Sequence, residues 1–234
     1  ELRVAIYSFT HSLIQNLISP RSEVRCPKTG RIAKSTHPRI TNNERRWTKN
    51  EQRKNQRSNL IVFLRHKPQL LKVTIITVVY NAAQFLRDCI ESVLAQDYAD
   101  IEYILIDGKS TDASFEIAKA YQSQISVLIS EPDQGMYDAL NKGIALATGE
   151  VIGILNADDM LADRGVITAV VNAFRQSGAE AVYGDLNYVA QDDVTKVQRK
   201  WRSAPAQPRD LALGWMPAHP TLYIKTDLFK AYGP

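Results

Sequence analysis

Two adjacent carboxylates, Asp158 and Asp159, occupy a place in this sequence where chemistry is expected. They follow the apolar run Val151–Leu155, which has the composition of a buried strand, after the short link Asn156-Ala157. Ligands of an open α/β sheet bind beyond the carboxyl ends of its strands, so these acids should stand at a binding edge. Two neighbouring carboxylates suit a hard divalent cation that also touches a diphosphate.

A short amphipathic helix should directly precede that strand. Asp133 stands before Gln134-Gly135, where an acidic side chain can cap a helix start. Apolar side chains then recur at helical spacing until Thr148-Gly149, at Tyr137, Leu140, Ile144 and Ala147. Residues Ser130–Asp159 therefore predict a turn, a helix, a strand and a strand-end pair of acids.

The same alternation of strands and helices begins at Val73. Runs typical of buried strands are Val73–Val79, Ile101–Ile106, Ile125–Ile129 and Val151–Leu155. Helical patterns between and after them are Phe85–Gln96, Ala113–Tyr121 and Val166–Phe174. The later strands Ala181–Tyr183, Leu186–Ala190 and Val197–Trp201 predict a hairpin and a mixed C-terminal part. The fold class expected is α/β, a doubly wound, Rossmann-like mixed sheet flanked by helices.

Polar side chains collect where these strands end. The strand ends carry Tyr80-Asn81, Asp107, Glu131 with Asp133, and Asp158-Asp159. Five carboxylates make this edge too acidic to cradle a phosphate unaided. A bridging cation would resolve that, as would hydrogen bonds from ribose, base and sugar hydroxyls to the acids. The sequence has neither a GxGxxG after the first strand nor a GxxxxGK[ST], so dinucleotide and P-loop sites are unsupported.

Charge divides the chain into two unlike parts. Residues 1–72 carry a net charge of +12, and residues 73–234 carry −8. The stretch Asn42–Asn59 has one apolar side chain in eighteen, too few to offset the entropy of ordering it. We therefore expect residues 1–72 to be a basic leader, disordered or extraneous, although Leu2–Ile18 and Leu60–Leu64 suit short helices or strands. Residues 73–234 should form the folded domain.

Charged residues, cysteines and apolar runs limit the classes of protein to which this chain can belong. Dense Lys/Arg suits a tether to nucleic acid or to an anionic membrane, but no aromatic interleaving or recognised module accompanies it, which favours a solvated tail. Cys26 and Cys89 stand 63 positions apart and outside any CxxC spacing, so neither a disulfide framework nor a structural zinc site is expected. No apolar run approaches the roughly 20 residues that span a bilayer. A soluble cytoplasmic protein is the expectation.

Four motifs in order resemble the family-2 glycosyltransferases, most closely the bacterial enzymes that build polysaccharide from nucleotide sugars. They are VTIITVVYN (Val73–Asn81), IDGKSTDAS (Ile106–Ser114), SEPDQGMYDALNKG (Ser130–Gly143) and LNADD (Leu155–Asp159). The resemblance covers about 73–234 and implies a GT-A fold, a nucleoside-diphosphate sugar donor and Mg²⁺ or Mn²⁺. It also implies inverting displacement toward a polysaccharide or lipid-linked acceptor, with peripheral association at the cytoplasmic face of the inner membrane and no specific nucleic-acid partner.

Site roles follow from the resemblance by position. Thr77, Val79 and Asn81 would line the base pocket, and Asp107 would accept a hydrogen bond from the base. The donor sugar and diphosphate would be bordered by Asp133, Gly135 and Asp138, while Asp158 would meet ribose or sugar and Asp159 the metal. Gly184-Asp185 resembles an acceptor-side loop, and His219 would orient the acceptor or the diphosphate. Asp107, Asp133 and Asp158 each also suit a purely capping role, and His219 a packed loop position.

This chain departs from the family pattern in three places. Lys109 stands where the family usually has a small residue, and Asn156 stands where many members have Asp. The acidic motif that usually supplies the general base lies beyond the stretch that matches Leu228–Gly233, and the sequence stops at Pro234. We therefore expect a domain truncated at its C-terminus, whose usual base is missing beyond Pro234 and in which Asp185 becomes the candidate base.

Two alternatives to an active transferase remain open. The first is a catalytically impaired nucleotide-sugar binding module. The second, from a different class, is a nucleic-acid-binding protein that acts through its basic leader.

Overall fold

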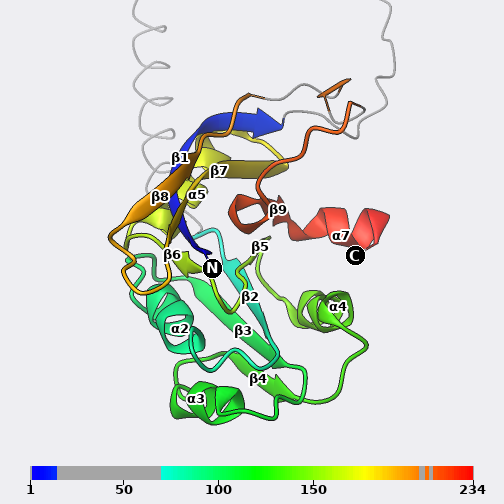
Figure 1. The fold of residues 1–234 in the computed structure, drawn as a ribbon. Helices are drawn as coiled ribbons and strands as arrows, with labels where there is room; N and C mark the ends of the chain where they lie inside the picture. Colours follow the sequence, from blue (N-terminus) through cyan, green and yellow to red (C-terminus); the bar gives the residue numbers. More distant parts are fainter. Residues whose placement is uncertain (1, 15–69, 206–208, 211–212, 234) are drawn as a thin grey trace, which may run out of the picture. The chain divides into compact units, whose positions relative to one another are not determined.

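The computed structural model describes residues 2–14, 70–205, 209–210 and 213–233, and within residues 2–14 it describes the side chains of Arg3 and Val4. These residues build one mixed sheet with helices on both faces (Figure 1). The sheet order is β4-β3-β2-β5-β9-β7-β1-β6, with β8 paired to β7. The strands are β1 (Leu2–Ile14), β2 (Val73–Val79), β3 (Ile101–Asp107), β4 (Val127–Ser130), β5 (Val151–Ile154), β6 (Met160–Leu161), β7 (Ala181–Ala190), β8 (Val197–Trp201) and β9 (Tyr223–Lys225).

The parallel half of the sheet creates the edge at which a ligand is expected. Strands β3 and β4 lie on one side of β2, and β5 lies on the other, with all four parallel. The strand order therefore reverses beside β2, which is the topological switch point where open α/β sheets bind ligands. Strands β2 and β3 end together, with Val79 opposite Asp107, whereas the β2–β5 pairing already stops at Ile76 and Ile154.

Helices lie on both faces of the sheet. They are α2 (Leu86–Leu94), α3 (Ser114–Ala120), α4 (Met136–Leu146), α5 (Val166–Ser177) and α7 (Thr226–Tyr232). Figure 1 shows α2 and α3 on one side of β2–β4 and α4 on the other. The face under α4 buries a small isoleucine-rich core, built from Ile76, Ile104, Ile106, Ala139, Leu140 and Ile152. A larger core on the other face contains side chains from α2 and α5.

The fold confirms the expected architecture and most of its elements. The four parallel strands and the helices α2 to α5 fall within a few residues of their predicted ranges. The hairpin is present, with Leu186 opposite Trp201, but its first strand is continuous with the predicted strand at Ala181 and forms β7. The short strands β6 and β9 and the 3₁₀ turn η1 (His219–Thr221) were not expected, because two- and three-residue elements carry no periodicity.

The first strand differs from the expectation of a leader outside the domain. β1 pairs antiparallel with β7, from Leu2 opposite Ala190 to Ile14 opposite Ala181, and parallel with β6. Residues 2–14 therefore belong to the same sheet as the α/β elements, as the apolar composition of Leu2–Ile18 allowed. The expectation for residues 15–69 lies outside the described residues. Within the part of the chain that the structure describes, each helix is too short or too polar to cross a bilayer.

Candidate functional site

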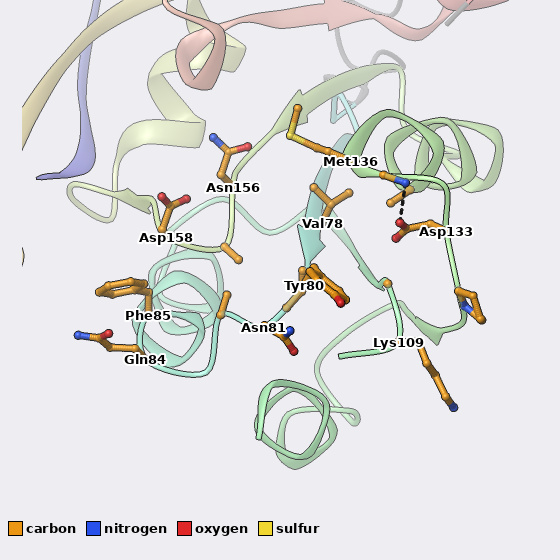
Figure 2. Close-up of a pocket in the computed structure, with 17 residues that line it drawn as sticks. Val78, Tyr80, Asn81, Gln84, Phe85, Lys109, Asp133, Met136, Asn156 and Asp158 are labelled. Carbon is orange, nitrogen blue, oxygen red and sulfur yellow. Dashed lines mark hydrogen bonds between the residues drawn. The ribbon is translucent and has the colours of Figure 1, made fainter. Parts of the chain in front are cut away.

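A cavity of about 1030 Å³ opens at the carboxyl edge of β2 and β5. Four segments supply its lining: the end of β2 with the residues before α2, the loop after β3, the start of α4, and the turn after β5. Figure 2 shows Tyr80 and Asn81 at the end of β2, with Asn156 and Asp158 on the turn after β5 and Met136 on α4, while the Lys109 side chain extends away from Tyr80. The cavity lies at the switch point predicted from the strand order.

Asn81 holds the end of β2 against the loop that follows β3. Its side-chain oxygen accepts hydrogen bonds from the backbone N–H groups of Thr111 (2.8 Å) and Asp112 (3.3 Å), and its own N–H donates to Ser110 Oγ (3.0 Å). Its φ of 51° lies in the left-handed region, which asparagine tolerates better than most residues. The residue lines the cavity, and it also fixes the shape of one wall.

Only part of the predicted base pocket lies at the cavity. Val79 lines it, but Thr77 is fully buried two residues deeper in the strand, where its hydroxyl accepts a hydrogen bond from Tyr103. Asp107 is also fully buried and absent from the cavity lining. Its carboxylate accepts hydrogen bonds from Ser130 Oγ (2.6 Å) and the Ser110 N–H. Asp107 therefore shapes the loop that follows β3, which is the capping role weighed above.

The start of α4 uses two acids in different ways. Asp133 lines the cavity, and its Oδ1 accepts the Gly135 N–H at 2.8 Å. Gly135 itself occupies the N-cap position, with φ 117°, so Asp133 precedes the cap instead of forming it. Asp138 accepts the Gln134 N–H at 3.1 Å and pairs with Lys142, and it does not line the cavity. Asp133 and Gly135 are thus brought to the predicted site, whereas Asp138 stabilises the helix start.

The two adjacent acids after β5 point in different directions. Asp158 is exposed and lines the cavity beside Asn156 (Figure 2). Asp159 is 3% exposed, and its oxygens accept the Val4 N–H (3.2 Å) and the Asn156 Nδ2 (2.9 Å). Burial raises the pKa of Asp159 to about 7, and the nearby charge of Asp158 adds to that rise. The side chain predicted to bind a metal is therefore engaged inside the protein, and its neighbour faces the cavity.

The donor set at this turn fits a cation that is shared with a ligand. Asn156 and Asp158 offer hard amide and carboxylate oxygens to the cavity, which suit Mg²⁺ or Mn²⁺. No group of three or more His, Cys, Asp or Glu side chains gathers to hold a metal among the described residues. The described residues therefore do not form a site that would surround a cation with protein ligands alone. A cation bound through one carboxylate and the oxygens of a diphosphate is the arrangement that these residues fit.

The predicted acceptor-side residues are not brought to the cavity. Asp185 on β7 is 3% exposed, and its carboxylate accepts hydrogen bonds from Arg202 (3.1 Å) and from the Ser203 N–H (2.8 Å). It therefore anchors the segment after β8 and is poorly placed to act as a base. His219 begins η1 and is exposed, but it is not part of the cavity lining. Pro234, beyond which the usual base was expected to be missing, lies outside the described residues, so the truncation stays a prediction.

Sequence reasoning missed several residues that line or support the cavity. Phe85 and Met136 line it, but as apolar residues within helical patterns they carry no signal that separates them from the core. Arg3 supports the turn after β5 from behind, with its Nε donating to the Asp158 carbonyl at 3.1 Å. Because 155 residues separate the two, no local pattern could have found this contact.

The family pattern and two relatives that match this chain are all glycosyltransferases. The pattern described as Glycosyl transferase family 2 matches residues 74–226. Glycosyltransferase GlyG of Streptococcus pneumoniae serotype 4 is 35% identical over 124 residues, which are 52% of this chain and 40% of that protein. A PGL/p-HBAD biosynthesis glycosyltransferase of Mycobacterium bovis is 36% identical over 118 residues, which are 48% of this chain and 46% of the relative. The chain thus spans less than half the length of these relatives.

Solved structures support the fold. The mannosyltransferase PcManGT of Pyrobaculum calidifontis, in complex with GDP-Man and Mn²⁺, aligns with a TM-score of 0.53 and 21% identity, covering 69% of this chain and 46% of that one. TarS residues 1–349 of S. aureus, in complex with UDP-GlcNAc, align with a TM-score of 0.54 and 17% identity, covering 68% and 47%. At these identities the likeness shows the GT-A fold alone. With the family pattern matching most of the α/β part, the chain belongs to glycosyltransferase family 2.

Proposed function

We propose that this chain binds a nucleoside-diphosphate sugar in the cavity at the carboxyl edge of β2 and β5, together with Mg²⁺ or Mn²⁺, and serves inverting transfer of the sugar. The acceptor would be a polysaccharide or a lipid-linked saccharide, reached at the cytoplasmic face of the membrane. The observation that carries the proposal is the cavity itself. It joins an exposed aromatic ring and amide on one wall to an exposed carboxylate on another, at the topological switch point.

The dimensions and lining of the cavity suit such a donor. Its volume of about 1030 Å³ is at the upper end of ordinary ligand sites, as a nucleotide carrying a sugar requires. Tyr80 is 66% exposed and offers a ring face on which a base can stack. Asn81, the next residue along the chain, adds an amide to the same wall. GDP-Man and UDP-GlcNAc in the two structural neighbours support a nucleotide sugar as the class of ligand.

The other end of the cavity suits the diphosphate. Asp158 would hold the cation, and the Asn156 amide oxygen lies in the same turn. A bound divalent cation neutralises charge that develops on a departing diphosphate, a contribution typically worth several kcal/mol. Asp133 lies on the wall formed by the start of α4, where it can accept a hydrogen bond from a sugar hydroxyl. The chain's own residues would thus bind and orient the donor from two walls.

A second candidate function is donor binding with weak or no transfer. Inverting displacement needs a general base within hydrogen-bond reach of the acceptor hydroxyl. Asp185, the candidate base, already accepts two hydrogen bonds and is not part of the cavity lining. This observation favours a domain that binds nucleotide sugar with metal but turns it over slowly as the 234-residue chain.

Titration calorimetry with UDP and with GDP, each with Mn²⁺ or with EDTA, tests the proposal. We expect metal-dependent binding, weakened tenfold or more by Asp158→Asn, because one charged ligand of the cation is lost. Asp227→Asn is the matched control, since Asp227 is an exposed acid on α7 that pairs only with Lys230 among the described residues. Binding that ignores both the metal and Asp158 would contradict the assignment. Salt-sensitive binding of arbitrary DNA without any nucleotide binding would favour the nucleic-acid alternative.

A further inference from the structure

Arg3 is a buried cation behind the acidic turn of the cavity. It is 3% exposed, and its guanidinium lies over the Phe85 ring at 5.1 Å. Nη1 donates to Asp88 Oδ2 at 2.6 Å, and Nε donates to the Asp158 carbonyl oxygen at 3.1 Å. Among the described residues, Nη2 is buried without a hydrogen-bond partner. One side chain therefore joins β1 to the start of α2 and to the turn after β5.

The same turn is held a second time by the next residue. The Val4 N–H donates to Asp159 Oδ1 at 3.2 Å, and β1 then pairs in parallel with β6 directly after the turn. Two of the residues tied to Arg3, namely Phe85 and Asp158, line the cavity. The contacts from β1 therefore lie immediately outside the wall that carries Asp158, and they hold its backbone without using its carboxylate.

We propose that Arg3 is the positioning residue for the Asp158 carboxylate, acting from β1 through the backbone of the turn and the start of α2. The inference rests on the proposed donor site, to which it adds a residue that touches neither ligand nor cation. The charges near the guanidinium are those of Asp88 on α2, with which it pairs, and of Asp159 in the turn. A fixed positive charge near Asp159 offsets part of the repulsion between Asp159 and Asp158, so the turn can keep one geometry before a cation arrives.

Burying Arg3 in this way does not favour the stability of the fold, which supports a role for Arg3 in the site. Burying a guanidinium is unfavourable, and leaving one of its donors unpaired adds to that cost. Replacing a whole buried ion pair by apolar side chains is often neutral or stabilising, and removing one partner is costly chiefly where the other stays buried. Asp88 is half-exposed, so water can solvate it when its partner is removed. Arg3→Met should therefore keep the packing on Phe85 and the melting temperature while it releases the turn.

The experiment compares the 234-residue protein with its Arg3→Met and Arg3→Lys variants. Arg87→Ala is the matched control, because Arg87 also lies over an aromatic ring and donates to one side chain, both on Tyr121, but at the exposed surface of α2. We expect Arg3→Met to lower the Mn²⁺-dependent affinity for UDP about ten- to hundredfold, as loss of an outer-shell support does. Arg3→Lys should restore part of that loss, and Arg87→Ala should leave the affinity unchanged.

Amide hydrogen exchange gives a readout that does not depend on any ligand. The Asp159 N–H donates to the Asn156 carbonyl and the Leu161 N–H to Ser92 Oγ, so both should be protected when the turn is held. We expect faster exchange at these two amides in Arg3→Met, with protection elsewhere unchanged. A general loss of protection with a lower melting temperature would overturn the proposal in favour of a purely structural role. Two further results for Arg3→Met would also overturn it. One is exchange of both amides at the wild-type rate, and the other is a loss of UDP affinity that is equal with and without Mn²⁺.

The two proposals fail in different ways. If the wild-type protein binds neither UDP nor GDP, the proposed function fails, while faster exchange confined to the turn still supports the positioning role. If the wild-type protein binds nucleotide with Mn²⁺ and Arg3→Met matches it in affinity and exchange, the positioning role fails and the proposed function stands.

Discussion

The absence of a side chain at Gly108 leaves the space that the Asp133 carboxylate occupies at the cavity wall. Gly108 directly follows β3, and a Cβ atom added there would overlap Oδ2 of Asp133. The other oxygen of Asp133 accepts the Gly135 N–H at the start of α4. The missing side chain at position 108 therefore determines where Asp133 lies and how closely the loop after β3 approaches α4.

Gly108→Ala should displace Asp133 and weaken donor binding. The clashing atoms belong to the end of the Asp133 side chain, which lines the cavity and can rotate away, so we expect the melting temperature to fall only slightly. Loss of the Asp133 position should lower the nucleotide affinity about tenfold, which corresponds to roughly 1.4 kcal/mol. Calorimetry with UDP and a thermal melt measure the two effects separately.

Gly165→Ala is the control for that variant, because its nearest contact, Asp163 Oδ1, lies at an ordinary 3.4 Å. It should leave both the affinity and the melting temperature near the wild-type values. Equal behaviour of the two variants would contradict the role assigned to Gly108.

Residue types at the site could be predicted from the sequence, but the direction of their side chains could not. Asp158 and Asp159 are neighbours in an irregular turn, where no pleat or helical period decides which of them faces the cavity. On β2 the pleat puts Thr77 and Val79 on the same face, but the cavity begins beyond the strand end. Val79 therefore reaches the cavity while Thr77, two residues deeper, contacts Tyr103 in the core.

At the scale of elements, a buried carboxylate ties the parallel strands together near the edge opposite the cavity. Glu102 on β3 is 7% exposed. It accepts hydrogen bonds from Thr74 Oγ1 on β2 (2.6 Å), from the Thr148 N–H after α4 (2.7 Å) and from Lys72 Nζ (2.9 Å). Burial by itself raises the pKa of the Glu102 carboxyl, but these hydrogen bonds outweigh it and bring the pKa to about 2.

This lowered pKa predicts a pH-dependent contribution to stability. A carboxyl whose pKa falls from 4.5 to about 2 on folding stabilises the protein fully above pH 4.5. The contribution is lost as the pH falls from about 4.5 toward 2, and it amounts to about 3 kcal/mol at neutral pH. Glu102→Gln should therefore lower the free energy of unfolding at pH 7, with the difference from wild type shrinking below pH 4.5. Urea denaturation at a series of pH values measures it.

Glu116→Gln, an exposed acid on α3, serves as the comparison and should change stability little at any pH. A Glu102→Gln deficit that is as large at pH 3 as at pH 7 would show that packing, and not the charge, stabilises this junction.

For the whole molecule, elements with long periodic patterns were predictable and those defined by distant partners were not. Strand β2 is predictable from its β-branched composition, and helix α4 is predictable from the helical spacing of its apolar side chains. Strand β9 has three residues, and its place between β5 and β7 depends on pairings with residues more than 40 positions away. Strand β1 lies in a basic segment whose charge suggested a leader, yet its neighbours in the sheet are β7 and β6.

Removal of residues 1–14 should therefore affect the domain, contrary to what a detachable leader would allow. The deletion leaves β7 without its partner along one whole side, from Ala181 to Ala190, and such an exposed edge favours association between copies. It also removes the contacts from Arg3 and Val4 to the turn that carries Asp158. We expect a lower melting temperature, concentration-dependent light scattering and a loss of Mn²⁺-dependent UDP affinity at least as large as that of Arg3→Met. A truncated protein that melts, remains monomeric and binds UDP like the full chain would return residues 2–14 to the leader. It would also show that contacts such as those of Ser92 and Asn156 suffice to hold the turn.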